Sequence, residues 1–99
     1  MDIIKIRYAK KALKFFSKAE KTLVNNIKDA INKLTKTPPE GDIKALSGYK
    51  DGRKRLRYGK YRIIFRYDES IEEKDEKEVN IIILLIINIG SRGDIYKED

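Results

Sequence analysis

The chain has 99 residues, with 23 Lys and Arg against 16 Asp and Glu, which leaves a formal net charge of +7. This length fits one domain, residues 1–99, with a modest core, and the positive charge favours an acidic partner such as nucleic acid. Cys and His are both absent, which excludes disulfides, thiolate or imidazole metal sites and His-activated nucleophiles, so we expect no metal and no cofactor.

Residues 2–8 alternate between apolar and basic side chains, which predicts a half-buried first strand. Apolar residues then recur at helical spacing in two parts of residues 9–34, and Ser17 to Glu20 has the form of a capping box between them. We therefore expect two helices that form a hairpin and cover one face of a sheet. Residues 37–52 contain two prolines and three glycines without a clear period, which predicts a surface loop.

Residues 53–67 predict a β-hairpin with a two-residue turn at Gly59-Lys60. Because side chains alternate along a strand, one face of this hairpin is apolar and is expected to face the helices: Leu56, Tyr58, Tyr61, Ile63, Phe65 and Tyr67. The other face is basic and is interrupted only by Ile64; it carries Arg53, Arg55, Arg57, Arg62 and Arg66.

The register of this hairpin opposes like charges, because Arg57 faces Arg62 and Arg53 faces Arg66. Such pairs are destabilising, and the hairpin itself contains no acidic residue before Asp68 to relieve them. A basic face that only discourages aggregation needs one or two lysines, whereas arginine favours bidentate recognition of phosphate. The pattern therefore favours a polyanionic ligand, most simply nucleic acid.

Residues 68–78 contain seven acidic side chains and two lysines, which predicts a solvated loop; contact with a basic partner, or mimicry of a polyanion, is the alternative. Residues 79–89 are nearly continuous in Ile and Leu, which predicts a central strand apolar on both faces, or one whose second face a partner covers. The apolar run is too short to span a membrane and the N-terminus lacks an apolar signal region, so a cytoplasmic location is expected.

These elements give the order β-α-α-β-β-β and predict an α+β fold, with a two-helix hairpin on one face of a mainly antiparallel sheet of about four strands. This order, together with several short motifs, resembles the RelE/ParE superfamily of toxins from type II toxin-antitoxin pairs over nearly the whole chain. The motifs are Leu46 with Gly48, Leu56-Arg57, the hairpin residues from Gly59 to Tyr67, and the close from Arg92 to Tyr96.

The likeness is greater to the RelE branch, whose members enter the ribosomal A site and cut mRNA without a metal. The resemblance implies five catalytic residues, Arg53, Arg55, Arg62, Arg92 and Tyr96, and we expect Arg57, Arg66, Lys44 and Lys97 to bind RNA. Tyr96 is implied to stack on a base and to activate the 2′-hydroxyl, which requires its pKa to fall from about 10 beside guanidinium groups. A cognate acidic antitoxin, the ribosome and mRNA are the implied partners.

Other interpretations remain open from the sequence. A ParE-like toxin would inhibit DNA gyrase without being an enzyme, and a plain basic RNA-binding module would have neither activity. Tyr96 would then merely cap the sheet, and Arg92 would form a surface ion pair with Asp94. The set Arg53, Arg55, Arg62, Arg92 and Tyr96 favours the ribonuclease.

Overall fold

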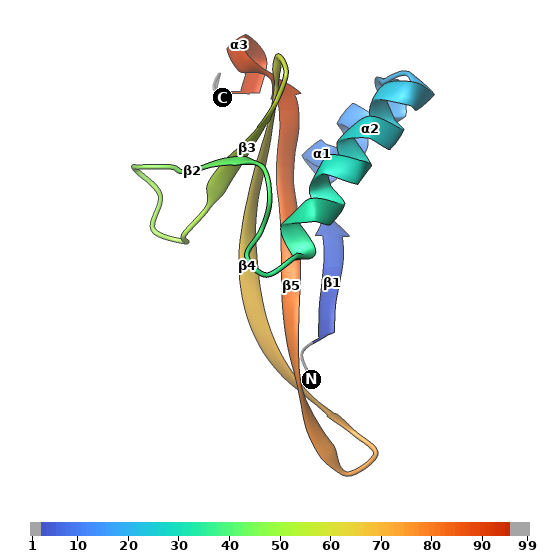
Figure 1. Cartoon of the computed structure of the whole chain (residues 1–99), viewed down its shortest axis with the longest axis vertical. Coiled ribbons are helices and arrows are strands. Elements are labelled where there is room, and N and C mark those ends of the chain that lie inside the picture. The colour runs from blue at the N-terminus through green and yellow to red at the C-terminus, as the bar shows by residue number, and fades with distance from the viewer. Residues whose placement is uncertain (1–2, 96–99) are drawn as a thin grey trace.

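The structure is a computed structural model that describes residues 3–95. Its elements are β1 (Ile3–Tyr8), α1 (Lys10–Lys18), α2 (Lys21–Asn32), the 3-10 turn η1 (Lys33–Thr35), β2 (Asp42–Ala45), β3 (Lys54–Tyr58), β4 (Tyr61–Lys74), β5 (Lys77–Ser91) and α3 (Arg92–Ile95). The strands form one sheet in the order β1-β5-β4-β3-β2, in which only the β1–β5 pair is parallel. The predicted α+β class is confirmed, with five strands rather than four (Figure 1).

Strand β2 lies where the sequence analysis expected only a loop, and that expectation is wrong for residues 42–45. Its four residues pair antiparallel with β3, placing Ile43 opposite Leu56 and Asp42 opposite Arg57. One apolar and one oppositely charged cross-strand pair therefore hold this short edge strand in place. It also extends the sheet on the side where the arginines lie.

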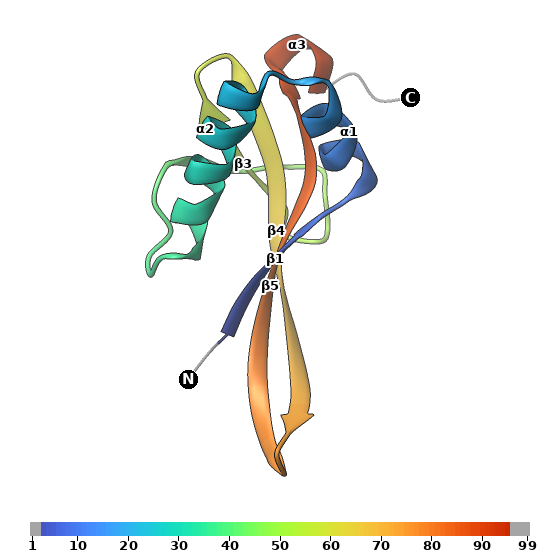
Figure 2. The same ribbon diagram turned by 90° about the vertical axis from the view of Figure 1, so that its right-hand side faces the viewer.

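The two helices cover one face of the sheet, as Figures 1 and 2 show from two sides. Residues Ile27 and Ile31 of α2 are fully buried and pack in one core with Ile63 and Phe65 of β4. Complete burial of such a side chain contributes about 1.5–3 kcal/mol, so this apolar stripe is what fixes α2 on the sheet. The hydroxyl of Tyr67 donates a hydrogen bond of 2.7 Å to the Leu34 carbonyl and joins β4 to the end of the helical layer.

The expected capping box does not form. Helix α1 continues through Lys18, so Ser17 lies inside it and donates to the Lys14 carbonyl at 2.7 Å. The chain breaks instead at Ala19 and Glu20, whose backbones are extended, and the Glu20 side chain does not cap α2. The Ser17 hydroxyl bonds to a carbonyl of its own helix, α1, and so does not cap α2.

Residues 68–78, expected to be a loop, belong to a long hairpin of β4 and β5 with its turn at Asp75 and Glu76. These two residues have φ angles of 53° and 62°, the positive pair that a type I′ turn requires. The pairing of β1 with β5 starts at Ile81, so residues 71–80 form a two-stranded ribbon. In Figures 1 and 2 it projects from the end of the molecule opposite α3. Strand β5 itself lies between β1 and β4, which confirms its predicted interior place.

Candidate functional site

The predicted register of the β3–β4 hairpin is confirmed. Arg57 lies opposite Arg62, Arg55 opposite Ile64, and Leu56 opposite Ile63. Leu56 and Ile63 belong to the helix-side core, so the arginines of both strands project from the other face of the sheet. Tyr61 packs against the same core and Tyr58 lines a hollow with residues of α2, as their predicted orientation required.

An open hollow of about 390 Å³, here called the arginine hollow, gathers side chains from four parts of the chain. It is lined by Lys44, Ala45, Leu46, Ser47, Arg55, Arg57, Arg62 and Arg92. Five predicted site residues therefore come together: three from the hairpin, one from β2, and Arg92 at the start of α3. The backbone N–H of Arg92 donates to the Lys60 carbonyl at 3.0 Å, which holds α3 beside the hairpin turn.

Arg62 lines the arginine hollow but is only 9% exposed to solvent. Its Nη1 donates to the carbonyls of Gly59 and Tyr61, at 3.2 Å and 3.0 Å, and within residues 3–95 it forms no ion pair with a carboxylate. Arg62 is therefore buried although it lies on the basic face of the hairpin, because its guanidinium bonds to the carbonyls of the turn. The bonds to these carbonyls hold the guanidinium in one orientation, and because the carbonyls are neutral its positive charge remains available to an anion.

Asp42 partly neutralises two other arginines of the hollow. Its Oδ2 lies 2.8 Å from Arg57 Nε and its Oδ1 lies 3.4 Å from Arg55 Nη1. The expectation that nothing relieves the opposed arginines is therefore wrong, since β2 brings this carboxylate to the hairpin. The Arg57–Asp42 pair is about half exposed, and such a pair contributes about 0–1 kcal/mol, so a phosphate can replace the carboxylate at Arg57 at little cost.

The remaining two hairpin arginines form a separate group, here called the Asp51 cluster: Asp51, Arg53, Arg66 and Asp68. Asp51 Oδ2 lies 2.8 Å from both Arg53 Nη2 and Arg66 Nη1, and Arg66 Nε lies 3.0 Å from Asp68 Oδ1. Hydrogen bonds from Arg53 first, and then from Arg66, hold the pKa of Asp51 well below its usual range. Neither arginine lines the arginine hollow, so the structure does not bring Arg53 and Arg66 together with the other predicted residues.

Two predicted residues, Tyr96 and Lys97, lie outside the described residues. Within residues 3–95 no group of three or more Asp or Glu side chains has the arrangement of a metal site. No helix in that range is long and apolar enough to cross a membrane.

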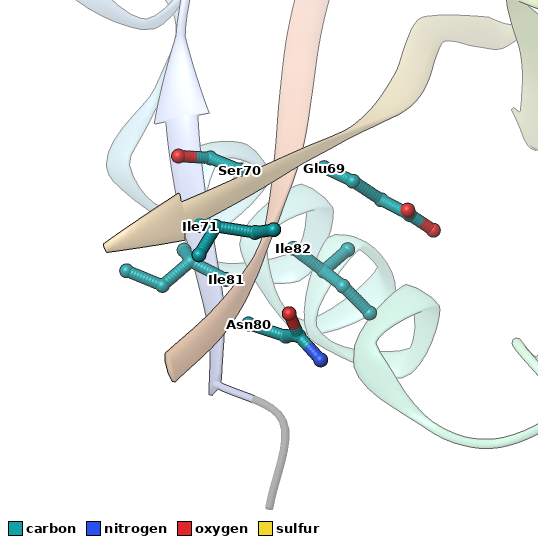
Figure 3. Close-up of a pocket in the computed structure, with 6 residues that line it drawn as sticks. All are labelled: Glu69, Ser70, Ile71, Asn80, Ile81 and Ile82. Carbon is teal, nitrogen blue, oxygen red and sulfur yellow. The ribbon is translucent and has the colours of Figure 1, made fainter. Parts of the chain in front are cut away.

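Another hollow, of about 500 Å³, lies at the base of the ribbon. Its lining comes only from β4 and β5: Glu69, Ser70, Ile71, Asn80, Ile81 and Ile82 (Figure 3). No cation lines it and the arginines lie toward the other end of the sheet, so it has no part in the candidate site.

Sequence reasoning missed the two carboxylates that divide the arginine face. Asp51 stands two residues before Arg53, a spacing that permits a local ion pair and was visible in the sequence. Asp42 reaches the arginines only through the pairing of β2 with β3, and the alternation of polar and apolar residues over residues 42–45 was its one signal.

Comparisons with known proteins agree with this architecture. A sequence model described as the ParE toxin of type II toxin-antitoxin system, parDE, matches residues 6–96. No curated protein matches the sequence. Among solved structures, the chain is similar to a chain in the crystal structure of the RelB-RelE antitoxin-toxin complex from Methanococcus jannaschii. Their TM-score is 0.58 and their identity 22%, over 91% of this chain and 94% of that chain, which shows a shared RelE-like fold.

Proposed function

The chain belongs to the ParE toxin family of the RelE/ParE superfamily and is a toxin of a type II toxin-antitoxin pair, and we propose that it acts as a ribosome-dependent endoribonuclease. It would cut mRNA in the ribosomal A site. The observation that carries this proposal is the arginine hollow, where Arg55, Arg62 and Arg92 converge. Among the described residues Arg62 bonds only to backbone carbonyls and to no carboxylate, which leaves its charge available to a phosphate.

The proposed reaction is an attack of the RNA's own 2′-oxygen on the adjacent phosphorus. The P–O bond to the 5′-oxygen breaks and this oxygen takes a proton from water as it leaves, which gives a 2′,3′-cyclic phosphate on one fragment and a 5′-hydroxyl on the other. Negative charge accumulates on the non-bridging oxygens in the transition state, and fixed donors aimed at it lower the barrier. We assign this role to Arg62, held by two carbonyls, with Arg55 and Arg92 placing the phosphate. No metal is required for this scheme.

Proton transfer is the second requirement of the reaction. We assign removal of the 2′-hydroxyl proton to Tyr96, which follows Arg92 closely in the sequence. The Tyr96→Phe variant keeps a ring that can stack on a base and removes only the hydroxyl. If this variant cleaves at the wild-type rate, Tyr96 serves in stacking and not in proton transfer.

The proposed main partner is a cognate antitoxin, by analogy with the antitoxin-toxin complex in which the structural relative was solved. A small acidic protein that lays a strand or helix on the toxin would shield the arginine hollow and keep phosphate out. Adding the antitoxin should therefore restore translation in an extract that the toxin has arrested.

A second function is supported by the match to the ParE family. In that alternative the chain inhibits DNA gyrase by binding it and catalyses nothing. The two functions separate in one experiment, in which purified toxin is added to a translating extract and to a gyrase supercoiling assay. We expect arrested translation with cut mRNA and unchanged supercoiling, whereas intact mRNA with blocked supercoiling would replace the nuclease by the gyrase inhibitor.

A further inference from the structure

A second cavity, of about 250 Å³, lies beside the arginine hollow and shares Leu46 with it. Its lining combines apolar residues with aromatic, amide and cationic ones: Lys11, Leu46, Tyr49, Arg53, Ile64, Ile87, Asn88 and Ile95. We call it the Tyr49 pocket. It lies on the sheet face away from the helix-side core, where Ile64 is the one apolar residue among the hairpin arginines.

The floor of the Tyr49 pocket is apolar and well packed. Ile64 and Ile95 are only 6% and 5% exposed, although neither belongs to the core between the helices and the sheet. Ile87 of β5 also lines the pocket, at the irregularity where the register with β4 shifts by one residue. A cavity of about 250 Å³ with these apolar residues in its lining has room for one planar ring system.

The wall of the pocket is a planar stack. The Cζ atom of Arg53 lies 4.1 Å from the centroid of the Tyr49 ring, and Tyr49 remains 43% exposed. Asp51 holds the Arg53 guanidinium through both of its carboxylate oxygens, so this wall is ordered before any ligand arrives. Preorganised side chains lose little entropy on binding, which favours affinity.

The rim carries groups suited to the edge of a base. Asn88 Oδ1 accepts a hydrogen bond of 2.9 Å from the Ile89 backbone N–H, which orients the amide and leaves its Nδ2 group as a donor. Lys11 adds a second donor, and with Arg53 it makes the rim cationic. An apolar peptide side chain would use none of these groups, whereas an RNA base would use the stack and the donors together.

We propose that the Tyr49 pocket binds one unstacked RNA base, adjacent to the nucleotide whose phosphate lies in the arginine hollow. This inference depends on the proposed function, because it takes RNA as the ligand of the hollow. The Tyr49–Arg53 stack then holds the base of the nucleotide beside the scissile bond. Stacking of a base on an aromatic side chain contributes about 1–3 kcal/mol, which corresponds to roughly 5- to 150-fold in affinity.

The test uses a short single-stranded RNA in which one nucleotide at a time is replaced by an abasic ribose. Affinity of the full-length protein is measured by fluorescence anisotropy at low salt, for the wild type and for Tyr49→Ala, Tyr49→Phe and Tyr58→Ala. Tyr58 is the matched control, an exposed tyrosine that lines a hollow with α2 and not the Tyr49 pocket. We expect one abasic position to weaken wild-type binding about 5- to 150-fold.

The variants then separate the outcomes. Tyr49→Ala should remove the sensitivity at that position, while Tyr49→Phe and Tyr58→Ala should keep it. Equal affinity at every abasic position, sensitivity that survives Tyr49→Ala, or no binding of the intact RNA would each overturn the pocket. If the pattern is found but the wild type leaves mRNA intact in a translating extract, the nuclease proposal fails and the base pocket stands.

Discussion

The arginine hollow and the Asp51 cluster both contain arginines from the same face of one hairpin, but the guanidinium groups of the two regions bond to different acceptors. Arg53 and Arg66 share Asp51 at 2.8 Å, and Arg66 also binds Asp68. In the hollow, Asp42 reaches Arg55 and Arg57, while Arg62 donates only to carbonyls among the described residues. The Asp51 cluster has two carboxylates for two arginines, and we call it the saturated half of the face. The hollow is the open half, because among the described residues one carboxylate serves Arg55 and Arg57 and none contacts Arg62.

This difference teaches that a count of arginines overstates a phosphate-binding surface. A guanidinium that already holds a carboxylate must lose that partner before it binds phosphate, whereas Arg62 contacts no carboxylate among the described residues. We therefore propose that the chemistry takes place in the hollow, while the Asp51 cluster orders the loop before β3 and holds Arg53 in the Tyr49 pocket. The resemblance to RelE-type toxins had implied that Arg53 is catalytic, but Arg53 lines the Tyr49 pocket and not the arginine hollow.

The largest expected effect is on cleavage. In the proposed reaction Arg62→Ala removes a donor that acts mainly in the transition state, so the loss in rate should be about 10²- to 10³-fold. Arg66→Ala, in the saturated half, should change the rate by less than about 10-fold, because its guanidinium is engaged by two carboxylates. Rates are measured as the appearance of cut mRNA in a translating extract.

Folding must be controlled in that experiment, since Arg62 is buried. Removing its hydrogen bonds should destabilise the protein by about 1–3 kcal/mol, so Arg62→Lys is included as a variant that keeps the charge. Both variants are checked by thermal unfolding at the assay temperature. If Arg66→Ala loses as much activity as a folded Arg62 variant, the division of the face into two halves is wrong.

A smaller effect is expected on the salt dependence of RNA binding. If Arg57 contacts one phosphate, Arg57→Ala should reduce the slope of log affinity against log salt by about 0.7–1. From the sequence alone Arg66 was expected to contribute equally, but its two carboxylates predict a smaller change for Arg66→Ala. Affinities from 50 to 300 mM salt give both slopes, and equal slopes for the two variants would mean that phosphate displaces Asp51 and Asp68 readily.

The smallest effect concerns pH. Because the folded-state pKa of Asp51 is depressed below its unfolded value of about 3.9, its contribution to stability is fully present above that value and is lost as the pH falls further. The melting temperature of the wild type should exceed that of Asp51→Asn by a constant amount from about pH 7 to 4.5. The difference should shrink below about pH 4; a difference that stays constant down to about pH 2 would show that Asp51 acts through packing and not through charge.

Local rules predicted much of this molecule. Alternation and the two-residue turn placed Arg55, Arg57 and Arg62 on one face with the correct register, because a two-residue turn leaves the pairing no freedom. Helical spacing placed Ile27 and Ile31 in the core, because residues four apart lie on the same face of a helix. These are features that neighbours in sequence decide.

The errors came from contacts between distant residues and from weak local signals. Strand β2 exists because β3 offers it a paired edge, which no property of residues 42–45 alone requires. The acidic ribbon is a strand pair although its charges favour a loop, because β4 and β5 continue their pairing outward from Ile81 and Ser70. The burial of Arg62 depends on the carbonyls of its own turn, which composition does not reveal.

The central claim, that the open half of the arginine face cleaves RNA through the 2′-oxygen, is tested most directly by the chemistry of the cut ends. mRNA from a translating extract treated with the wild-type toxin is mapped, and both new ends at each cut are identified. We predict cuts within the A-site codon that carry a 2′,3′-cyclic phosphate or 3′-phosphate on one side and a 5′-hydroxyl on the other. Cuts with 5′-phosphate and 3′-hydroxyl ends, or mRNA that remains intact, would contradict the account.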